Sequence, residues 1–339
     1  MSDVTRYIET HSENPAYNLA LEEYVLTHRT DGNYLMLWQN DNTIVIGQNQ
    51  NAEAEINRAF VEKHGIHVVR RTTGGGAVYH DLGNLNYSFI TDAAENDRMA
   101  QRFTAPVVRA LRELGVEAEA SGRNDILAEG KKVSGTAQRL TGGRILHHGT
   151  LLFDANPGMV AGALNADPLK FQSKSAKSVR SRIGNIRPML KKDMTLREFW
   201  DYLKGALAAG GLEDAALTEE ELAEVRRLKE TKYDTWEWNF GASPRYGLEN
   251  RRKWDGGILE VRLAVEQGHI AHVVFYGDFL ALCPLDGLRQ ALCGVPFRRE
   301  DVAAVLDRFP LGRCFGGIAR EEILDTIFDL RKIEKEEMK

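Results

Sequence analysis

The feature that most constrains the fold of this chain is a run of three glycines, Gly74 to Gly76, between two stretches with a strand-like pattern. Glycine loses more backbone freedom on folding than any other residue, so three in a row are costly to order. A chain accepts that cost where the backbone must take unusual angles or let a ligand come close. Arg70 and Arg71 precede the glycines. Because cations beside bare backbone N–H groups form an anion cradle, we expect a phosphate or carboxylate site here.

The glycine segment fits neither of the common nucleotide-binding motifs. The sequence contains no GxxxxGK[ST], and no GxGxxG that opens a helix. The residues after Gly76 have the pattern of a strand, so the positive charge must come from side chains rather than from a helix N-terminus. Strand alternation directs Arg70 and Arg71 to opposite faces, so we expect one of them to line the pocket. The alternative is a glycine hairpin with two solvated arginines.

Length and composition exclude several classes of protein. The chain has 339 residues, of which 43% are hydrophobic and 27% charged, which is typical of a globular protein with room for two domains. Its net charge of -5 argues against a broad nucleic-acid-binding face. No apolar run approaches membrane-spanning length, and residues 1–14 resemble neither a signal nor a transit peptide, so we expect a cytoplasmic protein without a membrane partner. The three cysteines, without a CxxC, indicate neither a disulfide framework nor a zinc site.

The pattern of apolar residues predicts an α+β fold with mixed and antiparallel sheets flanked by helices. Asn14 and Pro15 are a typical helix start. The tryptophan-rich segment 231–254 is expected to be a packed connector. We expect a catalytic domain over residues 1–245 and a small α+β domain over 246–339 with two strands and three helices. In the first domain we expect strands at 34–38 and 43–46 around a polar turn, strands at 66–71, 77–80 and 85–90, an antiparallel block at 125–153, and helices at 53–64, 97–114, 157–164, 195–208 and 218–230.

A second group of candidate residues surrounds Lys132. On a regular strand Lys132 and Ser134 would share one face, and Gly135 would allow close approach. A lysine there could act as a compact, reorientable charge, although a hairpin with surface lysines is the simpler interpretation. Asp125 could hold Mg²⁺ together with substrate phosphates, or it could cap a turn. For His148 alone, a satisfied core histidine is the simpler interpretation.

Other catalytic patterns are missing from the sequence. There is no GxSxG, no HExxH and no cysteine before Cys283. The chain therefore offers cations and backbone donors but no evident nucleophile near the glycines. That inventory suits chemistry in which one substrate supplies the nucleophile and the protein stabilises charge. Attack of a carboxylate on the α-phosphate of ATP is such a reaction.

In combination, the motifs resemble those of the lipoate–protein ligase A family, in the same order and spacing and over essentially the whole chain. The motifs that carry the resemblance are Arg70-Arg71-x-x-Gly74-Gly75-Gly76-x-Val78-x-His80-Asp81-x-Gly83-Asn84, Gly122-Arg123-Asn124-Asp125, Lys132-Val133-Ser134-Gly135, His147-His148-Gly149-Thr150, Ser178-Val179-Arg180-Ser181-Arg182 and Trp236-Glu237-Trp238-Asn239-Phe240-Gly241. The resemblance implies a catalytic domain of the type shared with biotin ligases, and it favours the functional interpretations of Lys132 and Asp125.

The resemblance also implies an activity in two half-reactions. Lipoate, or octanoate, and ATP give acyl-AMP and pyrophosphate, and the acyl group then passes to a lysine of an apo acceptor domain, as in E2 subunits of 2-oxoacid dehydrogenases and glycine cleavage H protein. Lys132 would be the catalytic residue, Lys132, Arg71 and His80 would bind lipoate, and Asp125 would be a weak Mg²⁺ ligand. The loop at 178–185 would close over the adenylate. The implied ATP- and adenylate-binding residues are Arg71, Gly74, Gly75, Gly76, Ala77, Val78, Tyr79, His80, Asn84, Asn124, Lys132, Ser134, Gly135, Thr136, Ala137, His148, Gly149, Ser178, Val179 and Arg180.

Three alternatives stay open at this point. An octanoyl or lipoyl transferase of the same superfamily would need a nucleophilic cysteine, and residues 1–282 contain none. A biotin ligase would carry a Gly-Arg-Gly-Arg sequence, which is absent. A non-catalytic lipoate- or acceptor-binding protein would release no pyrophosphate. The sequence leaves open the choice between lipoate and octanoate and the oligomeric state, for which a monomer is the default expectation.

Overall fold

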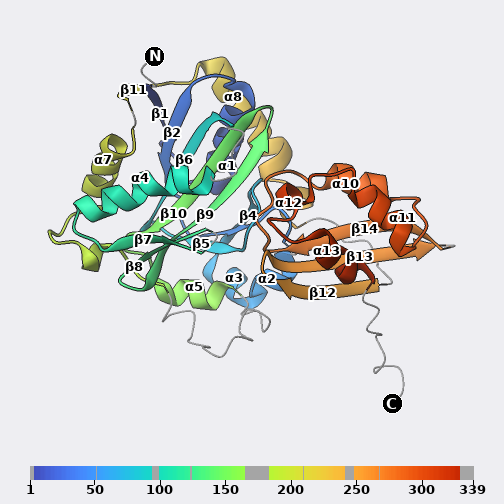
Figure 1. Ribbon diagram of the computed structural model, residues 1–339. Coiled ribbons are helices and arrows are strands. Elements are labelled where there is room, and N and C mark those ends of the chain that lie inside the picture. Colours follow the sequence, from blue (N-terminus) through green and yellow to red (C-terminus); the bar gives the residue numbers. More distant parts are fainter. Residues whose placement is uncertain are drawn as a thin grey trace. The chain divides into compact units, whose positions relative to one another are not determined.

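The computed structural model describes residues 4–50, 52–93, 99–122, 124–164, 183–208, 210–240, 248–266 and 268–328. Its internal contacts divide the chain into two units (Figure 1). The first unit comprises Met1–Gln48, Ala52–Thr72 and Ala77–Gly241. The second comprises Asn49–Asn51, Thr73–Gly76 and Ala242–Lys339, so the glycine run is grouped with the C-terminal residues.

The first unit is built on an eight-stranded mixed sheet in the described part of the chain, in the order β11-β1-β2-β6-β10-β9-β8-β7. β1 runs parallel to β11 and β2, and all other neighbours are antiparallel. The antiparallel block expected at 125–153 is therefore confirmed. The strands are β1 (Thr5–Glu9), β2 (Asn33–Trp38), β6 (Asn84–Asp92), β7 (Ala118–Ser121), β8 (Asp125–Ala128), β9 (Lys131–Thr141), β10 (Arg144–Leu152) and β11 (Leu212–Asp214).

A smaller sheet leads into the glycine run. It contains β3 (Thr43–Ile46), β4 (His67–Arg70) and β5 (Val78–His80), with β3 in the centre. β3 is parallel to β4 and antiparallel to β5. The strands expected at 43–46, 66–71 and 77–80 thus form one sheet. β2 and β3 flank the polar turn as expected, but they belong to different sheets.

Helices cover both faces of the large sheet. α1 (Pro15–His28) packs on one face, where Leu19 and Val25 share a hydrophobic core with Met36 of β2. α4 (Met99–Glu113) and α7 (Leu196–Ala206) pack on the other, where Val107 and Phe199 join a second core. The sheet is therefore buried on both sides, and its polar side chains must find partners within the protein.

The remaining helices agree with the expected positions with one difference. The helix expected at 53–64 is two helices, because Asn57 leaves the helical conformation and its side chain accepts a hydrogen bond from Phe60 N. In the described part of this unit, the other helical elements are α2 (Ala52–Glu55), α3 (Arg58–His64), α5 (Pro157–Ala163), a 3₁₀ turn (Arg187–Met189), α8 (Glu219–Leu228), a π-helical turn (Lys229–Tyr233) and α9 (Trp236–Asn239).

The second unit has a sheet and a core of its own. Three antiparallel strands, β12 (Leu248–Trp254), β13 (Gly257–Glu266) and β14 (His269–Gly277), are followed by α10 (Asp286–Leu292), α11 (Arg299–Leu306), α12 (Leu311–Cys314) and α13 (Arg320–Phe328). The expectation of two strands and three helices was too low. β12 lies in the segment that we expected to be a connector. The expectation missed this strand because its half-buried, charge-rich sequence shows no apolar alternation. The predicted α+β fold is confirmed in both units.

Candidate functional site

A β-bulge sets the direction of Lys132. Ile126 lies opposite Ser134, but the next residue of β8, Leu127, lies opposite Lys132, so Val133 is an extra residue on β9. Residues directly opposite each other share a face, and neighbours along a strand do not. Lys132 and Ser134 therefore lie on opposite faces. The expectation that they share one was wrong, because a bulge interrupts strand alternation.

The bulge brings Lys132 to the same face as Gly135 and Asp125. Asp125 lies opposite Gly135, and the Lys132 Nζ atom is 2.8 Å from the Asp125 Oδ1 atom. Both side chains keep about a third of their surface exposed, 36% and 35%. A Cβ atom at Gly135 would stand 3.1 Å from Lys132 Nζ. The group that comes close to the Gly135 backbone is therefore the Lys132 side chain, which lies across the strand.

The backbone of Lys132 is also tied to the segment that follows residue 182. Ile183 forms a parallel bridge with Lys132, and Gly184 N–H donates to Lys132 O at 2.9 Å. The strand carrying the lysine is thus paired with β8 and held at Ile183 as well. The predicted residues Ser178, Val179 and Arg180, and Arg123 of the motif, lie outside the described residues.

Arg70 is anchored by backbone carbonyls. Its guanidinium donates to Trp238 O, Gly47 O, Gln48 O and Asn239 O at 2.9 to 3.1 Å. In return, Trp238 Nε1 donates to Arg70 O at 2.9 Å. The side chain is buried. Arg70 therefore joins the end of β4 to the loop after β3 and to α9, which fixes the backbone at the point where Arg71 begins.

Arg71 has a different environment. It is 6% exposed, and its Nη1 donates to Val45 O at 3.1 Å. Burial lowers the pKa of the Arg71 guanidinium to about 10, against the attraction of the Glu22 carboxylate. A cation that has lost most of its water is stabilised when an anion comes near. The two neighbouring arginines thus occupy distinct environments, and the expectation that one of them lines an anion pocket stays a prediction.

A buried hydrogen-bond network, which the sequence patterns did not predict, starts at Glu22 of α1. His148 Nδ1 lies 2.9 Å from Glu22 Oε1, Ser88 Oγ donates to the same oxygen at 2.5 Å, and Trp38 Nε1 donates to Ser88 Oγ at 2.9 Å. Glu22 is 2% exposed. One sequence signal was present, since Glu22 follows Leu19 by three residues, at the spacing that places both on the buried face of α1. His148 is therefore held by a carboxylate.

His80 lies near this hydrogen-bond network, and its ring is neutral. It is buried, and its Nδ1 is 3.2 Å from Asn40 Nδ2. Burial, together with the nearby charge of Arg71, lowers the pKa of His80 to about 3. At neutral pH His80 offers hydrogen bonds but no charge.

The glycine run needs glycine for two reasons. Gly75 has φ of +91°, a conformation that residues with a Cβ rarely adopt. A Cβ at Gly74 would stand 2.5 Å from Ala281 N, and Gly75 N–H donates to Phe279 O at 3.1 Å. Both contacts lie within the second unit, so the backbone that approaches Gly74 here is that of residues 279–281. The predicted phosphate contact of these glycines stays a prediction.

Most other predicted residues belong to the strands around this region. Tyr79 is buried and donates to Asn42 Oδ1 at 2.9 Å. Asn124 and Thr136 exchange hydrogen bonds, of which Thr136 N to Asn124 O is 2.8 Å. The remaining described residues are placed as follows: Ala77 before β5, Val78 in β5, Asn84 buried in β6 with its Nδ2 donating to Asn86 Oδ1, Ala137 in β9 opposite His148, and Gly149 in β10 where a Cβ would meet the Tyr87 ring at 2.5 Å.

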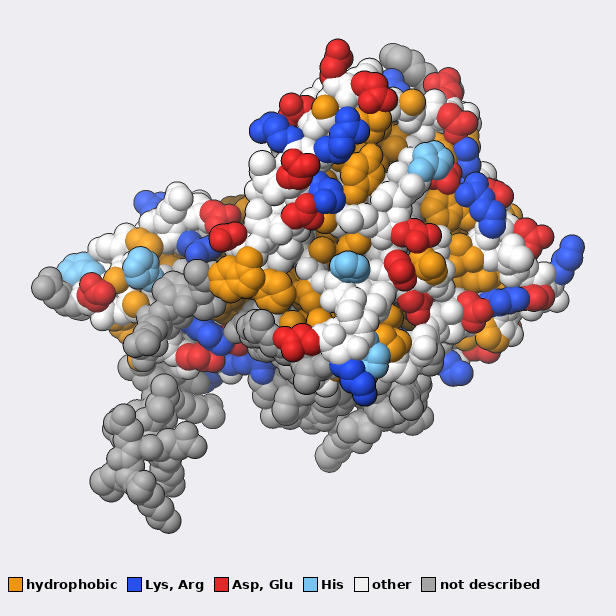
Figure 2. Space-filling view, turned by 180° about the vertical axis from the view of Figure 1, so that it is seen from behind, with side chains coloured by type: hydrophobic (Ala, Val, Ile, Leu, Met, Phe, Trp, Pro, Cys, Tyr) orange, Lys and Arg blue, Asp and Glu red, His pale blue; other side chains and the backbone are white. Residues whose placement is uncertain are grey.

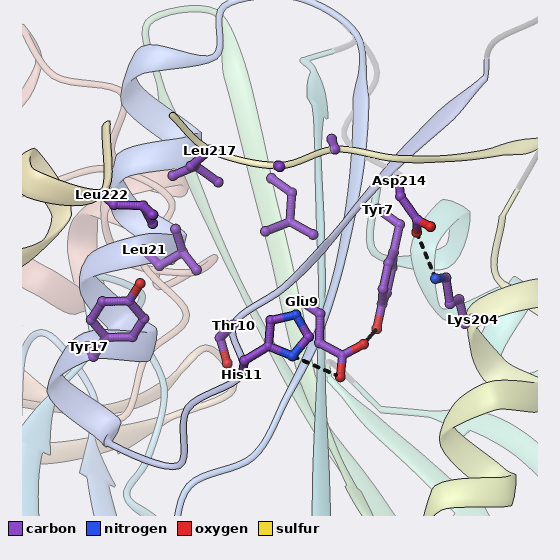
Figure 3. A pocket seen from close by; sticks show the side chains of 13 residues that line it. Tyr7, Glu9, Thr10, His11, Tyr17, Leu21, Lys204, Asp214, Leu217 and Leu222 are labelled. Atoms are coloured by element: carbon purple, nitrogen blue, oxygen red, sulfur yellow. Dashed lines mark hydrogen bonds and ion pairs between the residues drawn. The ribbon is translucent and has the colours of Figure 1, made fainter. Parts of the chain in front are cut away.

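A separate cavity of about 540 Å³ contains none of the predicted residues (Figure 3). It is lined by residues of β1 and the turn after it, α1, α7, β11, the segment that leads to α8, and α8 itself. Its ionisable side chains lie beside one another: Lys204 Nζ is 2.7 Å from Asp214 Oδ1, and His11 Nδ1 is 3.6 Å from Glu9 Oε1. This cavity does not combine the features expected of the anion site.

Three further observations concern metal, membrane and nucleic acid. In the described ranges no three His, Cys, Asp or Glu side chains form a metal-holding group, and no helix there is long and apolar enough to cross a membrane. On the face shown in Figure 2, the described Lys and Arg side chains are interspersed with Asp and Glu. That mixture fits the net charge of -5.

Comparison with known proteins identifies the class. Residues 14–208 match the lipoyl protein ligase A/B catalytic domain, and residues 243–327 match the bacterial lipoate protein ligase C-terminus. Lipoate-protein ligase LplJ of Bacillus subtilis is 41% identical over 93% of this chain and 97% of its own length. The chain therefore belongs to the lipoate–protein ligase family and is an enzyme of the ligase class.

Two solved structures share the catalytic fold. A lipoate-protein ligase A bound with ATP is 30% identical, with a TM-score of 0.61, over 71% of this chain and 99% of that chain. A bipartite lipoate protein ligase of Thermoplasma acidophilum, described with its E2 lipoyl domain, is 31% identical, with a TM-score of 0.62, over 73% of this chain and 100% of that chain.

Proposed function

We propose that this enzyme uses ATP to convert lipoate to lipoyl-AMP and then transfers the lipoyl group to one lysine of an acceptor domain. The observation that carries the proposal is the Lys132 ammonium, which lies across Gly135, stays partly exposed and is paired with Asp125. The ATP-bound relative supports the choice of nucleotide.

The chemistry of the first half-reaction suits such a lysine. A lipoate carboxylate oxygen forms a bond to the α-phosphorus, and the bond from that phosphorus to the bridging oxygen of pyrophosphate breaks. Two anionic reactants must come together while charge builds on the α-phosphate oxygens. Lys132 would turn from Asp125 toward those oxygens, since the ammonium is a point charge on a flexible stem. Loss of one such electrostatic group typically costs about 10²–10³ in rate.

Arg71 and His80 would complement Lys132. The buried Arg71 guanidinium would attract the phosphates or the carboxylate, and Arg70 would hold its backbone in place through the carbonyls that it binds. His80 would donate or accept a hydrogen bond without adding charge. The amides of Gly75 to Tyr79 remain our candidates for phosphate contacts, and the segment 178–185 for excluding water from the adenylate.

The residues fit Mg²⁺ as a partner of ATP. Mg²⁺ usually keeps several waters and takes one or two carboxylates plus substrate phosphates. Asp125 is a single carboxylate beside Lys132, so it could supply one oxygen once the lysine has turned away. When bound, the ion would neutralise charge on the departing pyrophosphate.

Acceptor and cellular location are also proposals. The relative described with its E2 lipoyl domain supports an acceptor of that kind, and H protein is the other candidate. We expect a monomeric cytoplasmic enzyme whose C-terminal residues 246–339 form an accessory domain.

One assay tests the proposed function. The protein is mixed with lipoate, ATP, Mg²⁺ and an apo E2 lipoyl domain, and pyrophosphate and the mass of the acceptor are followed. We expect ATP-dependent pyrophosphate release and one lipoyl group per acceptor. Acceptor modification from a lipoyl or octanoyl carrier without ATP would indicate a transferase, and ligand binding without pyrophosphate would indicate a non-catalytic protein.

A further inference from the structure

Two of the three cysteines face each other within the second unit. Cys283 lies in the segment between β14 and α10, and Cys314 is the last residue of α12. Their Sγ atoms are 2.9 Å apart. Leu282 N–H donates to Arg313 O at 2.8 Å, one residue before each cysteine. The backbone itself therefore holds the two segments side by side, and the closeness of the sulfurs does not depend on side-chain rotation alone.

The two thiols have different environments. Cys283 is partly exposed, whereas Cys314 is buried. The hydrogen bond to Cys314 lowers the pKa of the Cys283 thiol, with a contribution from the charge of Arg313. The same bond and burial raise the pKa of Cys314. Because the thiolate is the nucleophile in thiol chemistry, Cys283 is suited to attack a disulfide first. Cys314 is then placed to attack the sulfur of Cys283.

The surroundings favour thiol oxidation over metal binding. No third His, Cys, Asp or Glu in the described ranges completes a metal-holding group with this pair. A covalent S–S bond is about 2.05 Å long, so the sulfurs would close by roughly 0.9 Å from their separation of 2.9 Å. Cys293 at the end of α10 is exposed and offers a comparison thiol on the same unit.

We propose that Cys283 and Cys314 are a site of reversible oxidation by a low-molecular-weight disulfide. The Cys283 thiolate attacks one sulfur of the disulfide, which gives a mixed disulfide and one thiolate. Cys314 loses its proton and attacks Cys283 Sγ, which releases the second thiolate. The protein gives up two protons and two electrons, and the small disulfide is reduced to two thiols.

The bond would fix the stretch on which the glycine run packs. Phe279 O accepts the Gly75 N–H, and a Cβ at Gly316, just after α12, would stand 2.5 Å from Leu280 N. A link from Cys283 to Cys314 would therefore lock residues 279–283 against the end of α12. Oxidation should slow hydrogen exchange at the Gly75 amide, because its acceptor would open less often.

The test treats the full chain with oxidised glutathione and maps its thiols by mass spectrometry of non-reduced digests. We expect a peptide pair joined through Cys283 and Cys314, with the loss of two hydrogens, that dithiothreitol separates again. Amide exchange on the same samples should be slower at Gly75 in the oxidised form. Cys293→Ser should leave the link unchanged.

Two variants separate the order of attack. In Cys314→Ser, a glutathione adduct should accumulate on Cys283, because no second thiol displaces it. In Cys283→Ser, no link should form and Cys314 should stay reduced; this partly exposed position keeps the test valid if the buried substitution impairs folding. Glutathione on Cys293 alone, with Cys283 and Cys314 still reduced, would overturn the proposal. None of these readouts needs ligase activity, so they stand apart from the proposed function.

Discussion

The surroundings of Arg70 and those of Lys132 show two opposite uses of a cation in the same unit. Arg70 is buried and donates to four backbone carbonyl oxygens from two separate parts of the chain, the loop after β3 and α9. Lys132, on the bulged strand β9, is partly exposed, and within the described residues its one carboxylate partner is Asp125. The first cation is fully committed to holding the fold. The second can exchange its partner at low cost, which is what charge stabilisation during a reaction requires.

Whether a charge is fixed or movable therefore depends on the partners of the side chain rather than on the residue type. An arginine whose planar fork meets several carbonyls at once cannot move without leaving them unsatisfied. A lysine beside one exposed carboxylate loses little when it turns, because such pairs contribute about 0–1 kcal/mol. Substitutions at the two sites should therefore affect different properties.

The largest effect is expected for Lys132→Ala. Removing the movable charge should lower the rate of acceptor lipoylation by about 10²–10³. Lys131→Ala removes the exposed neighbouring lysine and should leave the rate nearly unchanged. The measurement is the initial rate of lipoyl-domain mass increase. Equal rates for the two variants would remove the distinction between Lys132 and an ordinary surface lysine.

Arg70→Met should act on stability. It leaves four carbonyl oxygens without their charged donor, so the free energy of unfolding should fall by about 3 kcal/mol. Arg109→Met, at an exposed helix position, should change it by less than about 0.5 kcal/mol. Urea unfolding of both variants measures the difference. Unchanged stability in Arg70→Met, combined with weakened ATP binding, would assign Arg70 to the ligand instead of to the fold.

Gly135→Ala tests the path of the lysine across the strand. The new Cβ would stand 3.1 Å from Lys132 Nζ, so the ammonium must shift by a few tenths of an ångström. We expect a roughly tenfold fall in kcat with little change in stability, because small misplacements of a reacting group are costly. Gly205→Ala, where a Cβ meets nothing within 4 Å, is the matched control. Full activity in Gly135→Ala would show that the lysine does not depend on this approach.

The smallest expected effect is on the pH dependence of stability, and it concerns a buried histidine, His147. Burial lowers the pKa of His147 to about 3, whereas an unfolded histidine has a pKa of about 6.5. Between these values the unfolded chain binds a proton that the folded chain refuses, so stability falls as the pH drops from about 6.5 toward 3.

His147→Phe should therefore reduce the pH dependence of stability over that range, while His67→Gln, at an exposed position, should leave it as it is. Thermal unfolding at several pH values measures the slopes. If wild type and His147→Phe give the same slope, His147 is not held neutral in the folded state.

Sequence patterns located the elements better than the directions of side chains. The strand boundaries around the glycine run and the helix start at Asn14 follow from local chemistry, so they could be predicted. The face of Lys132 could not, because the bulge at Val133 arises from pairing with β8. β12 was missed because its exposed charges hide strand alternation.

For the same reason, local motifs mark only some of the residues of the candidate site, whose roles stay predictions. Arg71, His80 and Lys132 are marked by motifs, and the structure gives each a distinct environment. Glu22 and Trp38 were missed because a carboxylate and an indole inside apolar elements look like ordinary helix and strand residues until Ser88 and His148 are placed beside them. Long-range pairing of this kind is not encoded in any local window.

The most direct test of the central claim is the release of pyrophosphate from ATP and octanoate with no acceptor present. We predict a burst of pyrophosphate from the wild-type protein and none from Lys132→Ala, with the acyl group held as an adenylate that denaturation frees from the protein. A burst of the same size in the variant, or an octanoyl group bonded to a cysteine of the wild type, would contradict the account.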